Sequence, residues 1–475
     1  MPPKKEKPKQ LGNAKELKEK LYKEPVRTWD TLSENERKQA FDYAERFRIF
    51  LNAARTERKA IQVFVDRASK EKFKELSVRS KGSKFFQSMH GKTLAVAVIG
   101  RKPLTEGLRI ITAHVDCPRL DLKANPLYED SGMAFLKTHY YGGVKKYQWV
   151  ARSLALCGTI IRGDGSVLDV HVGLDPDDPV FTIPDLLPHL ARKQMDQKAS
   201  DFIPAENLNL VVGSTPFHDK DADERVKLAL LELLNKKYDI TEEDFTSAEL
   251  QVVPAEPARD AGFDRGLIAG YGQDDRVCAY TCFTAAMETE NPEHTAIAVF
   301  YDKEEIGSEG NTSAKSRFLE TFIMDLMEKT GTQPKARDLY RVFMNSKALS
   351  ADVAAGLDPT YADVYEKRNS ARLGYGINIT KYTGHGGKYM ASDANAEYAA
   401  WIRKLFNDNA IVWQAGGHGK IDEGGGGTVA KFLAVTGVDI IDCGPPVLSM
   451  HSPMEISSKE DIWMCHKAFK VFFNS

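Results

Sequence analysis

The feature that most constrains the fold is an alternation of short apolar runs with helical patterns along most of the chain. Five runs are predicted to be strands, at 93–99, 108–113, 295–301, 411–413 and 438–441. Helices are predicted over about 30–74, from about Arg276, from Thr312, and from Ser458 to the C-terminus. Strands that alternate with helices form a mostly parallel sheet with helices on both faces, so the pattern predicts an α/β fold.

A segment of different character interrupts this pattern between residues 118 and 257. Prolines recur in it, and a hairpin signal at 163–165 separates the apolar residues 159–161 from the alternating run 167–172. The sequence therefore predicts a basic flexible tail at 1–25, a main domain at 26–117 plus 258–475, and an inserted β-rich domain at 118–257.

Composition and charge exclude several classes of function for these 475 residues. There are 65 Lys and Arg against 67 Asp and Glu, a formal charge of -2, so nucleic acid is not an expected partner. No apolar run is long enough to span a membrane, and the basic N-terminus lacks the apolar region of a secretory signal. We therefore expect a cytoplasmic protein whose six cysteines are reduced packing residues.

Histidine and acidic side chains follow apolar runs at five places in the sequence. These are His114 with Asp116, Asp274-Asp275, Glu304-Glu305, Asp352, and His451. In open α/β sheets the ligand-binding crevice lies outside the carboxyl ends of the strands, and mixed histidine and carboxylate sets bind zinc or a similar divalent ion. Taken singly, each residue has an ordinary structural alternative as a cap, a turn residue or a hydrogen-bonding group.

The adjacent carboxylates Glu304 and Glu305 are harder to explain by structure alone, because a turn needs only one polar residue after the strand at 295–301. Neighbouring side chains that leave a strand point in opposite directions. One could bind a metal while the other faces the substrate as a general base. A carboxylate can also bridge two ions about 3.5 to 4 Å apart, the separation found in two-metal hydrolytic sites.

Five motifs in a fixed order resemble one family. They are Thr112-Ala-His-Val-Asp116, Gly272-Gln-Asp-Asp-Arg276, Asp302-Lys-Glu-Glu-Ile-Gly-Ser308, Leu349-Ser-Ala-Asp-Val353 and Ser449-Met-His-Ser452. The set is similar to that of the aspartyl aminopeptidase and vacuolar aminopeptidase I family of di-zinc metalloaminopeptidases, over nearly the whole chain after the tail. The resemblance implies a zinc exopeptidase fold at 26–117 plus 258–475, with the segment 118–257 as a dimerisation domain.

The same resemblance implies a role for each site residue. His114 and Asp352 would bind one metal, Glu305 and His451 the second, and Asp274 would bridge both. Glu304 would be the general base that activates the attacking water, and Asp116 would orient the imidazole of His114. Asp275 remains an alternative to Asp274 as the bridging ligand. Two divalent ions per subunit are implied, as zinc, with cobalt or manganese as alternatives.

The insert and one later loop carry the implied contacts to substrate. Pro188-His-Leu-Ala191 matches a family motif, so His189 would reach the active site of a partner subunit. The family's dimers commonly assemble into tetrahedral dodecamers. Lys381 matches a lysine that faces an acidic substrate side chain, and Lys388 and Tyr389 stand where the aspartyl branch has Gln-Arg-Tyr-Ala. These departures leave acidic, neutral or both kinds of N-terminal residue as substrates.

The sequence therefore predicts a metal-dependent aminopeptidase that removes single N-terminal residues from short peptides and self-associates through its insert. Two alternatives stay open, because the motifs specify the metal chemistry better than the leaving group. One is a di-metal deacylase acting on N-acyl amino acids. The other is a non-catalytic peptide-binding shell, against which the complete set of expected ligands and the base argues.

Overall fold

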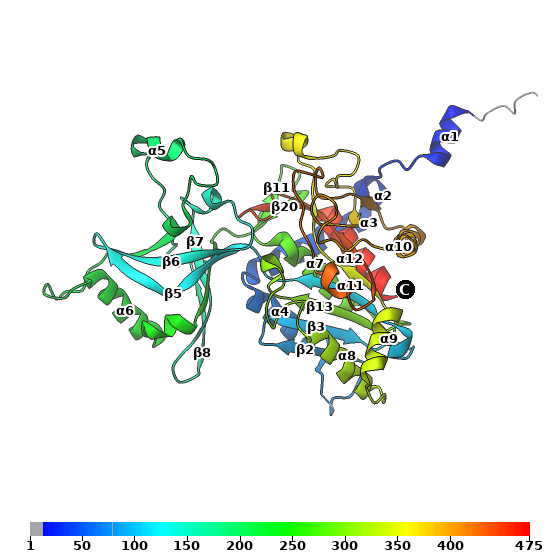
Figure 1. Cartoon of the computed structure of the whole chain (residues 1–475), viewed down its shortest axis with the longest axis horizontal. Helices are drawn as coiled ribbons and strands as arrows, with labels where there is room; N and C mark the ends of the chain where they lie inside the picture. The colour runs from blue at the N-terminus through cyan, green and yellow to red at the C-terminus, as the bar shows by residue number, and fades with distance from the viewer. Residues whose placement is uncertain (1–12, 78) are drawn as a thin grey trace, which may run out of the picture.

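A nine-stranded sheet forms the centre of the larger of two lobes (Figure 1). The computed structural model describes residues 13–77 and 79–475. In these residues the strand order is β1 (Lys74–Glu75), β2 (Lys84–Met89), β3 (Thr93–Val98), β13 (Ala296–Tyr301), β4 (Arg109–His114), β14 (Lys347–Ser350), β18 (Asp439–Gly444), β16 (Ile377–Thr380) and β17 (Trp413–Ala415). The central strands β13, β4, β14 and β18 are parallel to one another. The predicted α/β fold with a mostly parallel sheet is confirmed.

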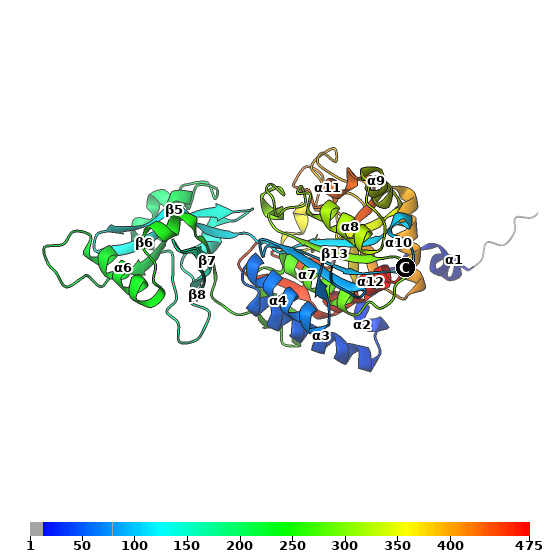
Figure 2. The same cartoon turned by 90° about the horizontal axis from the view of Figure 1, so that it is seen from below.

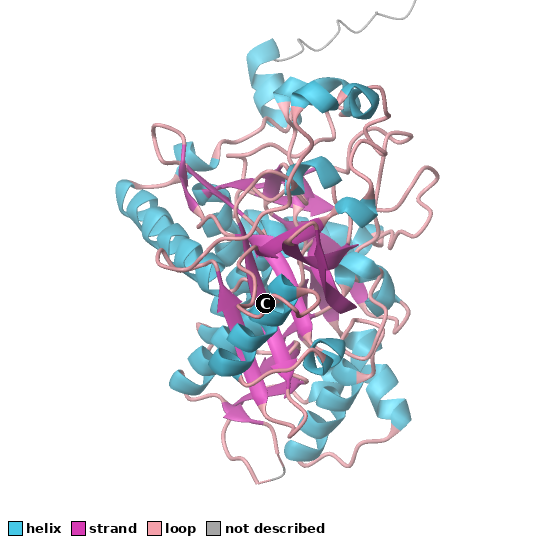
Figure 3. Cartoon of the chain, turned by 90° about the vertical axis from the view of Figure 1, so that its left-hand side faces the viewer, coloured by secondary structure: helices cyan, strands magenta, loops and turns pink. Residues whose placement is uncertain are grey.

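Helices cover both faces of this sheet, as Figure 3 shows. One apolar core joins the first face to α3 (Glu34–Ala53), α4 (Glu57–Lys70), α7 (Gln273–Met287), α10 (Ala396–Asp408) and α12 (Lys459–Phe473). A second core joins the other face to α8 (Phe318–Lys329), α9 (Ala336–Asn345) and α11 (Ala430–Ala434). Ile111 of β4 belongs to the first core and Ile110 to the second, because successive strand side chains point to opposite faces.

The second lobe is built on an antiparallel six-stranded sheet whose strands all lie between residues 118 and 257. Their order is β8 (Val167–Val172), β7 (Leu154–Ile161), β10 (Glu249–Pro254), β5 (Arg119–Asp130), β6 (Met133–Tyr141) and β9 (Asn209–Gly213). The lobe also contains α5 (Arg192–Met195) and α6 (Arg225–Tyr238) and projects to one side of the main sheet (Figures 1 and 2). The predicted hairpin is present as β7 and β8.

A small third sheet pairs strands from segments that follow or precede elements of the main domain. Its order is β11 (Arg259–Ala261), β12 (Leu267–Gly270), β20 (Glu455–Ser458), β19 (Pro446–Leu448) and β15 (Ala354–Ala355). Strand β15 follows β14, β19 follows β18, and β12 precedes α7. The sheet therefore holds three segments that approach the same end of the main sheet.

Several predicted elements of the main domain begin or end a few residues away from their predicted limits, and contacts account for two of these differences. The helix expected from Thr312 begins at Phe318, because the Thr312 hydroxyl donates to the Asp302 carboxylate and keeps this segment in a turn. The strand expected at 411–413 is β17, Trp413–Ala415. Ile411 and Val412 are apolar because they are buried, but they precede the strand. The residues that pair with β16 begin at Trp413.

The N-terminal part also differs from its prediction. The helical stretch expected over 30–74 is two helices, α3 and α4, and the Thr56 side chain caps the second by accepting from the N–H of Lys59. Within the predicted tail, Ala14–Leu21 is a helix, α1, with no buried residue, followed by α2 (Thr28–Thr31). Residues 1–12 of the tail lie outside the described residues. No helix of the described chain is long and apolar enough to cross a bilayer.

Candidate metal centre

Histidine and carboxylate side chains converge at the carboxyl ends of the central parallel strands. His114 is the last residue of β4, and Glu304 and Glu305 lie in the short helix η6 (Glu304–Ile306) that follows β13. Asp352 comes two residues after β14. The start of α7 contributes Asp274, and the loop between β19 and β20 contributes His451. Because β4, β13 and β14 run parallel in register, their carboxyl ends deliver these residues to one place.

Two groups of three side chains could each hold a metal ion, and they share Asp274. The first group is His114, Asp274 and Asp352, and the second is Asp274, Glu305 and His451. In each group the possible ligand atoms lie within 4.8 Å of one another. Asp274 directs Oδ1 toward Nε2 of His114 at 3.3 Å and Oδ2 toward Nε2 of His451 at 3.2 Å. One carboxylate thus faces both histidines, which is the arrangement that a bridging ligand requires.

Both histidines present Nε2 to this cluster because Nδ1 is held elsewhere. Nδ1 of His114 lies 3.0 Å from the backbone carbonyl of Asp116 and 3.3 Å from its Oδ1. Nδ1 of His451 lies 3.1 Å from the carbonyl of Gly143. A proton on each Nδ1 satisfies these acceptors and leaves the Nε2 lone pair available to a metal.

Asp275 occupies a different position from its neighbour, to which it is joined by a cis peptide bond. Its Oδ2 accepts from the backbone N–H of His114 at 3.3 Å. Burial raises the pKa of Asp275 well above its ordinary value, and the charge of Asp274 raises it further. This geometry favours Asp274 over Asp275 as the bridge between two ions.

Sequence reasoning missed Glu455, which holds the backbone around two of the candidate ligands. Its Oε2 accepts from the N–H of Asp274 at 3.1 Å, and its Oε1 accepts from the N–H of His451 at 2.8 Å. Burial raises the pKa of Glu455 to about 8. The only signal in the sequence was its place at the start of the strand after His451, which is too weak to identify it.

The cluster concentrates negative charge, which protonated His114 and His451 offset only in part. Among the described residues, no Lys or Arg forms an ion pair with Asp274, Glu304, Glu305 or Asp352. Burial raises the pKa of Glu305 and Asp352 well above their ordinary values and that of Glu304 to about 7. Oε1 of Glu305 is buried without a hydrogen-bond partner in the described chain. Buried carboxylates need a compensating cation, so this donor set fits divalent metal ions.

These pKa shifts predict that the chain without metal becomes less stable as the pH rises from about 5 to 9. Burial raises the pKa of Glu304 and Glu455 from 4.5 to about 7 and 8, so ionising them costs more free energy in the folded state. The pKa of His451 is lowered by burial but raised more strongly by Glu305 and Asp274, to about 10. The stability that this shift contributes is present below pH 6.5 and is lost as the pH rises through 10.

Bound divalent ions neutralise the same carboxylates, so the difference in Tm between metal-loaded and chelator-treated protein should widen as the pH rises. Thermal unfolding at several pH values between 5 and 9, with and without metal, measures this difference. Groups that titrate elsewhere in the chain change the Tm of the metal-loaded and the metal-free protein alike, so their effects cancel in the difference. Two parallel curves would show that the cluster does not behave as described.

The predicted substrate-binding residues lie outside the cluster in this single chain. His189 is exposed in η3 (Pro188–Leu190), which contacts α5 in the second lobe. Lys381 and Lys388 are exposed and pair with Asp393 at 3.6 and 2.7 Å, and Tyr389 is 74% exposed. Their contacts to substrate stay predictions, since a partner subunit or a bound peptide would be needed to form them.

Comparisons with known proteins point to one family. The family model described as "Aminopeptidase I zinc metalloprotease (M18)" matches residues 50–473. A probable M18 family aminopeptidase 1 of Clostridium acetobutylicum is 45% identical, over 96% of this chain and 99% of its own length. The crystal structure of an M18 aminopeptidase of Thermotoga maritima superposes with a TM-score of 0.92 at 41% identity, over 95% of this chain and 100% of that one. The mApe1 dodecamer of S. cerevisiae gives a TM-score of 0.73 at 25% identity, over 91% and 96%.

Proposed function

This chain belongs to the M18 family of aminopeptidase I zinc metalloproteases, and from this premise we propose that it removes single N-terminal residues, acidic, neutral or both, from short peptides through a pair of metal ions. The observation that carries the proposal is the pair of three-residue groups that share Asp274. His114 and Asp352 would complete one metal site, and Glu305 and His451 the other. Zinc is the proposed metal, because the family is one of zinc metalloproteases.

Two divalent cations, when bound, would polarise the scissile carbonyl and lower the pKa of a water molecule between them. Glu304 belongs to neither group, but its Oε2 lies 3.9 Å from Nε2 of His114. From there it would take the proton of the attacking water and return it to the leaving amine. Asp116 would keep the imidazole of His114 in the orientation that exposes Nε2.

We further propose that the segment 118–257 is a dimerisation domain and that the dimers assemble into a tetrahedral dodecamer. The segment carries exposed apolar side chains in and near the turn that holds His189, namely Val180, Leu186, Leu187, Leu190 and Met195. Exposed apolar side chains that gather in one short segment favour contact with another protein surface. The dodecameric assembly of the S. cerevisiae relative supports the same proposal. His189 would then contact substrate in the active site of the partner.

Lys381, Lys388 and Tyr389 are the proposed determinants of the preferred N-terminal residue. Both lysines already face a carboxylate, that of Asp393, so an acidic substrate side chain would compete with it. A neutral side chain would leave this pairing undisturbed. A cytoplasmic location is also proposed, in line with the six free and buried cysteines.

The experiment that tests the proposal is hydrolysis of unblocked dipeptides that begin with Asp, Glu, Leu or Lys. The protein is first stripped with a chelator and then reloaded with zinc, cobalt or manganese. We expect the stripped protein to lose activity and added metal to restore release of the first residue, and the ranking of substrates identifies the specificity. N-acetylated dipeptides and N-acyl amino acids serve as controls. Equal turnover of acetylated substrates would favour the deacylase, and no turnover with any metal would favour a non-catalytic shell.

A further inference from the structure

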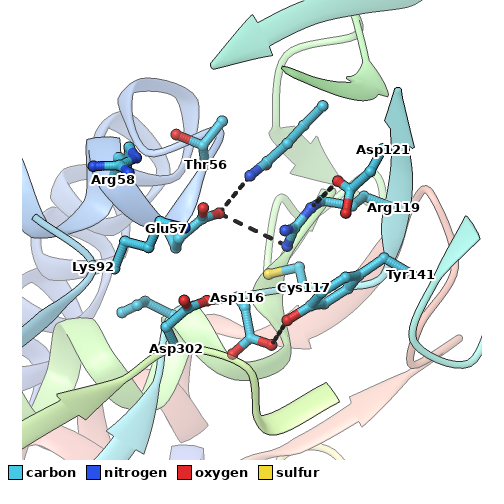
Figure 4. Close-up of polar contacts among 12 residues, drawn as sticks. Thr56, Glu57, Arg58, Lys92, Asp116, Cys117, Arg119, Asp121, Tyr141 and Asp302 are labelled. Carbon is cyan, nitrogen blue, oxygen red and sulfur yellow. Dashed lines mark hydrogen bonds and ion pairs between the residues drawn. The ribbon is translucent and has the colours of Figure 1, made fainter. Parts of the chain in front are cut away.

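A set of buried polar contacts connects the insert, which is the second lobe at residues 118–257, to the candidate metal centre (Figure 4). The contacts pass through Tyr141 and Arg119, which belong to the insert, and reach Asp116 at the end of the main sheet. None of these contacts involves a candidate substrate residue. They therefore raise the question of what the insert does for the metal centre of its own chain.

Asp116 is the point where these contacts meet the candidate metal ligands. Its side chain is fully buried and accepts from the backbone N–H of Glu304 through Oδ1 and from that of Glu305 through Oδ2, both at 3.1 Å. Oδ1 also lies 3.3 Å from Nδ1 of His114. The hydroxyl of Tyr141 donates to Oδ2 at 2.8 Å. This one carboxylate thus contacts the imidazole of His114 and the backbone of both residues at the start of η6.

Tyr141 is itself held in place by the strand register of the insert. It is the last residue of β6 and pairs directly with Arg119, the first residue of β5. The guanidinium of Arg119 lies 3.8 Å from the centroid of the Tyr141 ring, as a cation–π contact. The ring lies against Arg119 and directs its hydroxyl toward Asp116, as Figure 4 shows.

Arg119 is in turn fixed by carboxylates from both lobes. Its Nε donates to Asp121 of β5 at 2.8 Å, and its Nη1 lies 3.7 Å from Oε2 of Glu57, at the start of α4. The side chains of Arg119 and Glu57 are 8% and 2% exposed. Gln251 of β10 donates to the same Oε2 of Glu57 at 2.6 Å. One hydrogen bond to Asp121 and one ion pair with Glu57 hold the guanidinium between the two lobes, while its Nη1 makes no hydrogen bond in the described chain.

The two residues after Tyr141 are glycines that lie close to candidate metal ligands, so a side chain at either position would be tight. A Cβ on Gly142 would lie 3.2 Å from Cβ and 3.3 Å from Oε2 of Glu305, and Gly142 has a φ of 72°. A Cβ on Gly143 would lie 3.1 Å from Nδ1 of His451. The residues that follow β6 therefore lie against Glu305 and His451, two members of the second candidate metal group.

We propose that Tyr141 is a positioning residue through which the insert fixes Asp116, and with it His114 and the Glu304–Glu305 backbone, in the arrangement that the metal centre needs. This inference rests on the metal centre proposed above. It gives the insert a function within its own chain, separate from its proposed part in self-association.

The test is the variant Tyr141→Phe in the full-length protein, which keeps the ring on Arg119 and removes only the hydroxyl. Metal-free protein is titrated with cobalt, and the absorption spectrum of the bound ion and its dissociation constant are measured. We expect cobalt binding to weaken about 10-fold and kcat with zinc to fall about 10- to 100-fold, the range found when groups that orient metal ligands are removed. KM should stay within about twofold, because the hydroxyl contacts no substrate in this proposal.

Tyr398→Phe is the matched control. Tyr398 is buried, and its hydroxyl donates to the carbonyl of Ala348 at 2.7 Å, so this change also removes one buried hydrogen bond. Both variants are compared by thermal unfolding. If Tyr141→Phe and Tyr398→Phe lower the Tm alike and both leave cobalt binding unchanged, Tyr141 is only structural and the proposal is wrong.

A double variant tests whether Tyr141 acts through Asp116. In an Asp116→Ala background, which lacks the acceptor of the Tyr141 hydroxyl, Tyr141→Phe should weaken cobalt binding by less than about twofold, because the two changes remove one shared contact. A full additional 10-fold loss would show that Tyr141 acts by another route and would overturn the proposal. Cobalt binding by a wild-type chain that cleaves no peptide would refute only the proposed function, whereas a wild-type chain that binds no cobalt would refute both.

Discussion

Replacing Glu304 by Gln should lower kcat by about 10²- to 10⁴-fold, the usual contribution of a general base, while the metal content of the protein stays unchanged. Glutamine keeps the size and the hydrogen-bonding oxygen of the side chain but cannot take a proton from water. Glu304 belongs to neither group of candidate ligands, so its replacement removes no ligand from either. The expected result is a metal-loaded and folded protein that turns over very slowly.

The surroundings of Glu304 make it suited to proton transfer. Its side chain is 15% exposed, and burial raises its pKa to about 7 before any metal is bound. Nearby cations lower a carboxyl pKa, so metal binding should bring Glu304 to its deprotonated form at neutral pH. Its backbone N–H donates to Asp116, which limits the positions that the side chain can reach.

Metal analysis together with steady-state kinetics on the preferred dipeptide checks this prediction. Glu304→Asp is the informative companion, since it keeps the carboxyl group but withdraws it by one methylene and should retain part of the activity. Activity of Glu304→Gln within about tenfold of the wild type would mean that another group is the base. Loss of metal from Glu304→Gln would instead mean that Glu304 is a ligand.

Replacing Asp274 by Asn should remove most of the bound metal and lower kcat by more than about 10³-fold. Changing a group that only orients a metal ligand already lowers metal affinity or activity by about 10- to 100-fold, and the loss of a ligand shared by two ions should be larger. Asp274 offers one oxygen to each histidine, so both proposed metal sites lose a negatively charged ligand at once. A second consequence concerns stability. The rise in Tm that metal produces in the wild type should be largely absent, since this rise depends on binding to the folded state.

Asp275→Asn is the matched comparison, and it decides between the two adjacent aspartates. Asp275 accepts from the N–H of His114, which the amide oxygen of asparagine can also do. Burial raises the pKa of Asp275, so asparagine resembles its neutral form. We therefore expect Asp275→Asn to change the metal affinity by less than about tenfold, because the backbone N–H of His114 keeps its hydrogen bond. If Asp275→Asn loses its metal and Asp274→Asn keeps it, the assignment of the bridge is reversed.

Much of the site could be predicted from the sequence, because it depends on where parallel strands end. His114, Glu304 and Asp352 each follow an apolar run, and a parallel sheet brings the ends of such runs together whatever their separation along the chain. The pair Asp274-Asp275 and His451 are candidates on the same ground, and the resemblance to the family adds their individual roles. The choice of Asp274 over Asp275 was left open, since spacing does not reveal which of two neighbouring carboxylates faces a histidine.

The contribution of Tyr141 could not be predicted, for a physical reason. It depends on the pairing of Arg119 with Tyr141, 22 residues later, and strand register is a property of two segments together. Glu455 was missed for a similar reason. Its carboxylate can accept from the backbone N–H of Asp274 only when β20 lies beside α7 in the folded chain. The role of His189 requires a second subunit, so neither one sequence nor one chain can establish it.

The order in which the ligands occur along the chain bears on how the protein is made. Of the candidate ligands, His114 precedes the insert, Asp274 follows it, and His451 comes after all the others. Synthesis proceeds from the N-terminus, so a nascent chain lacks at least one candidate ligand until the segment that carries His451 has been made. A product of premature termination or of cleavage before residue 451 lacks it permanently. Incomplete copies of this peptidase would therefore be inert toward the other unfinished chains around them.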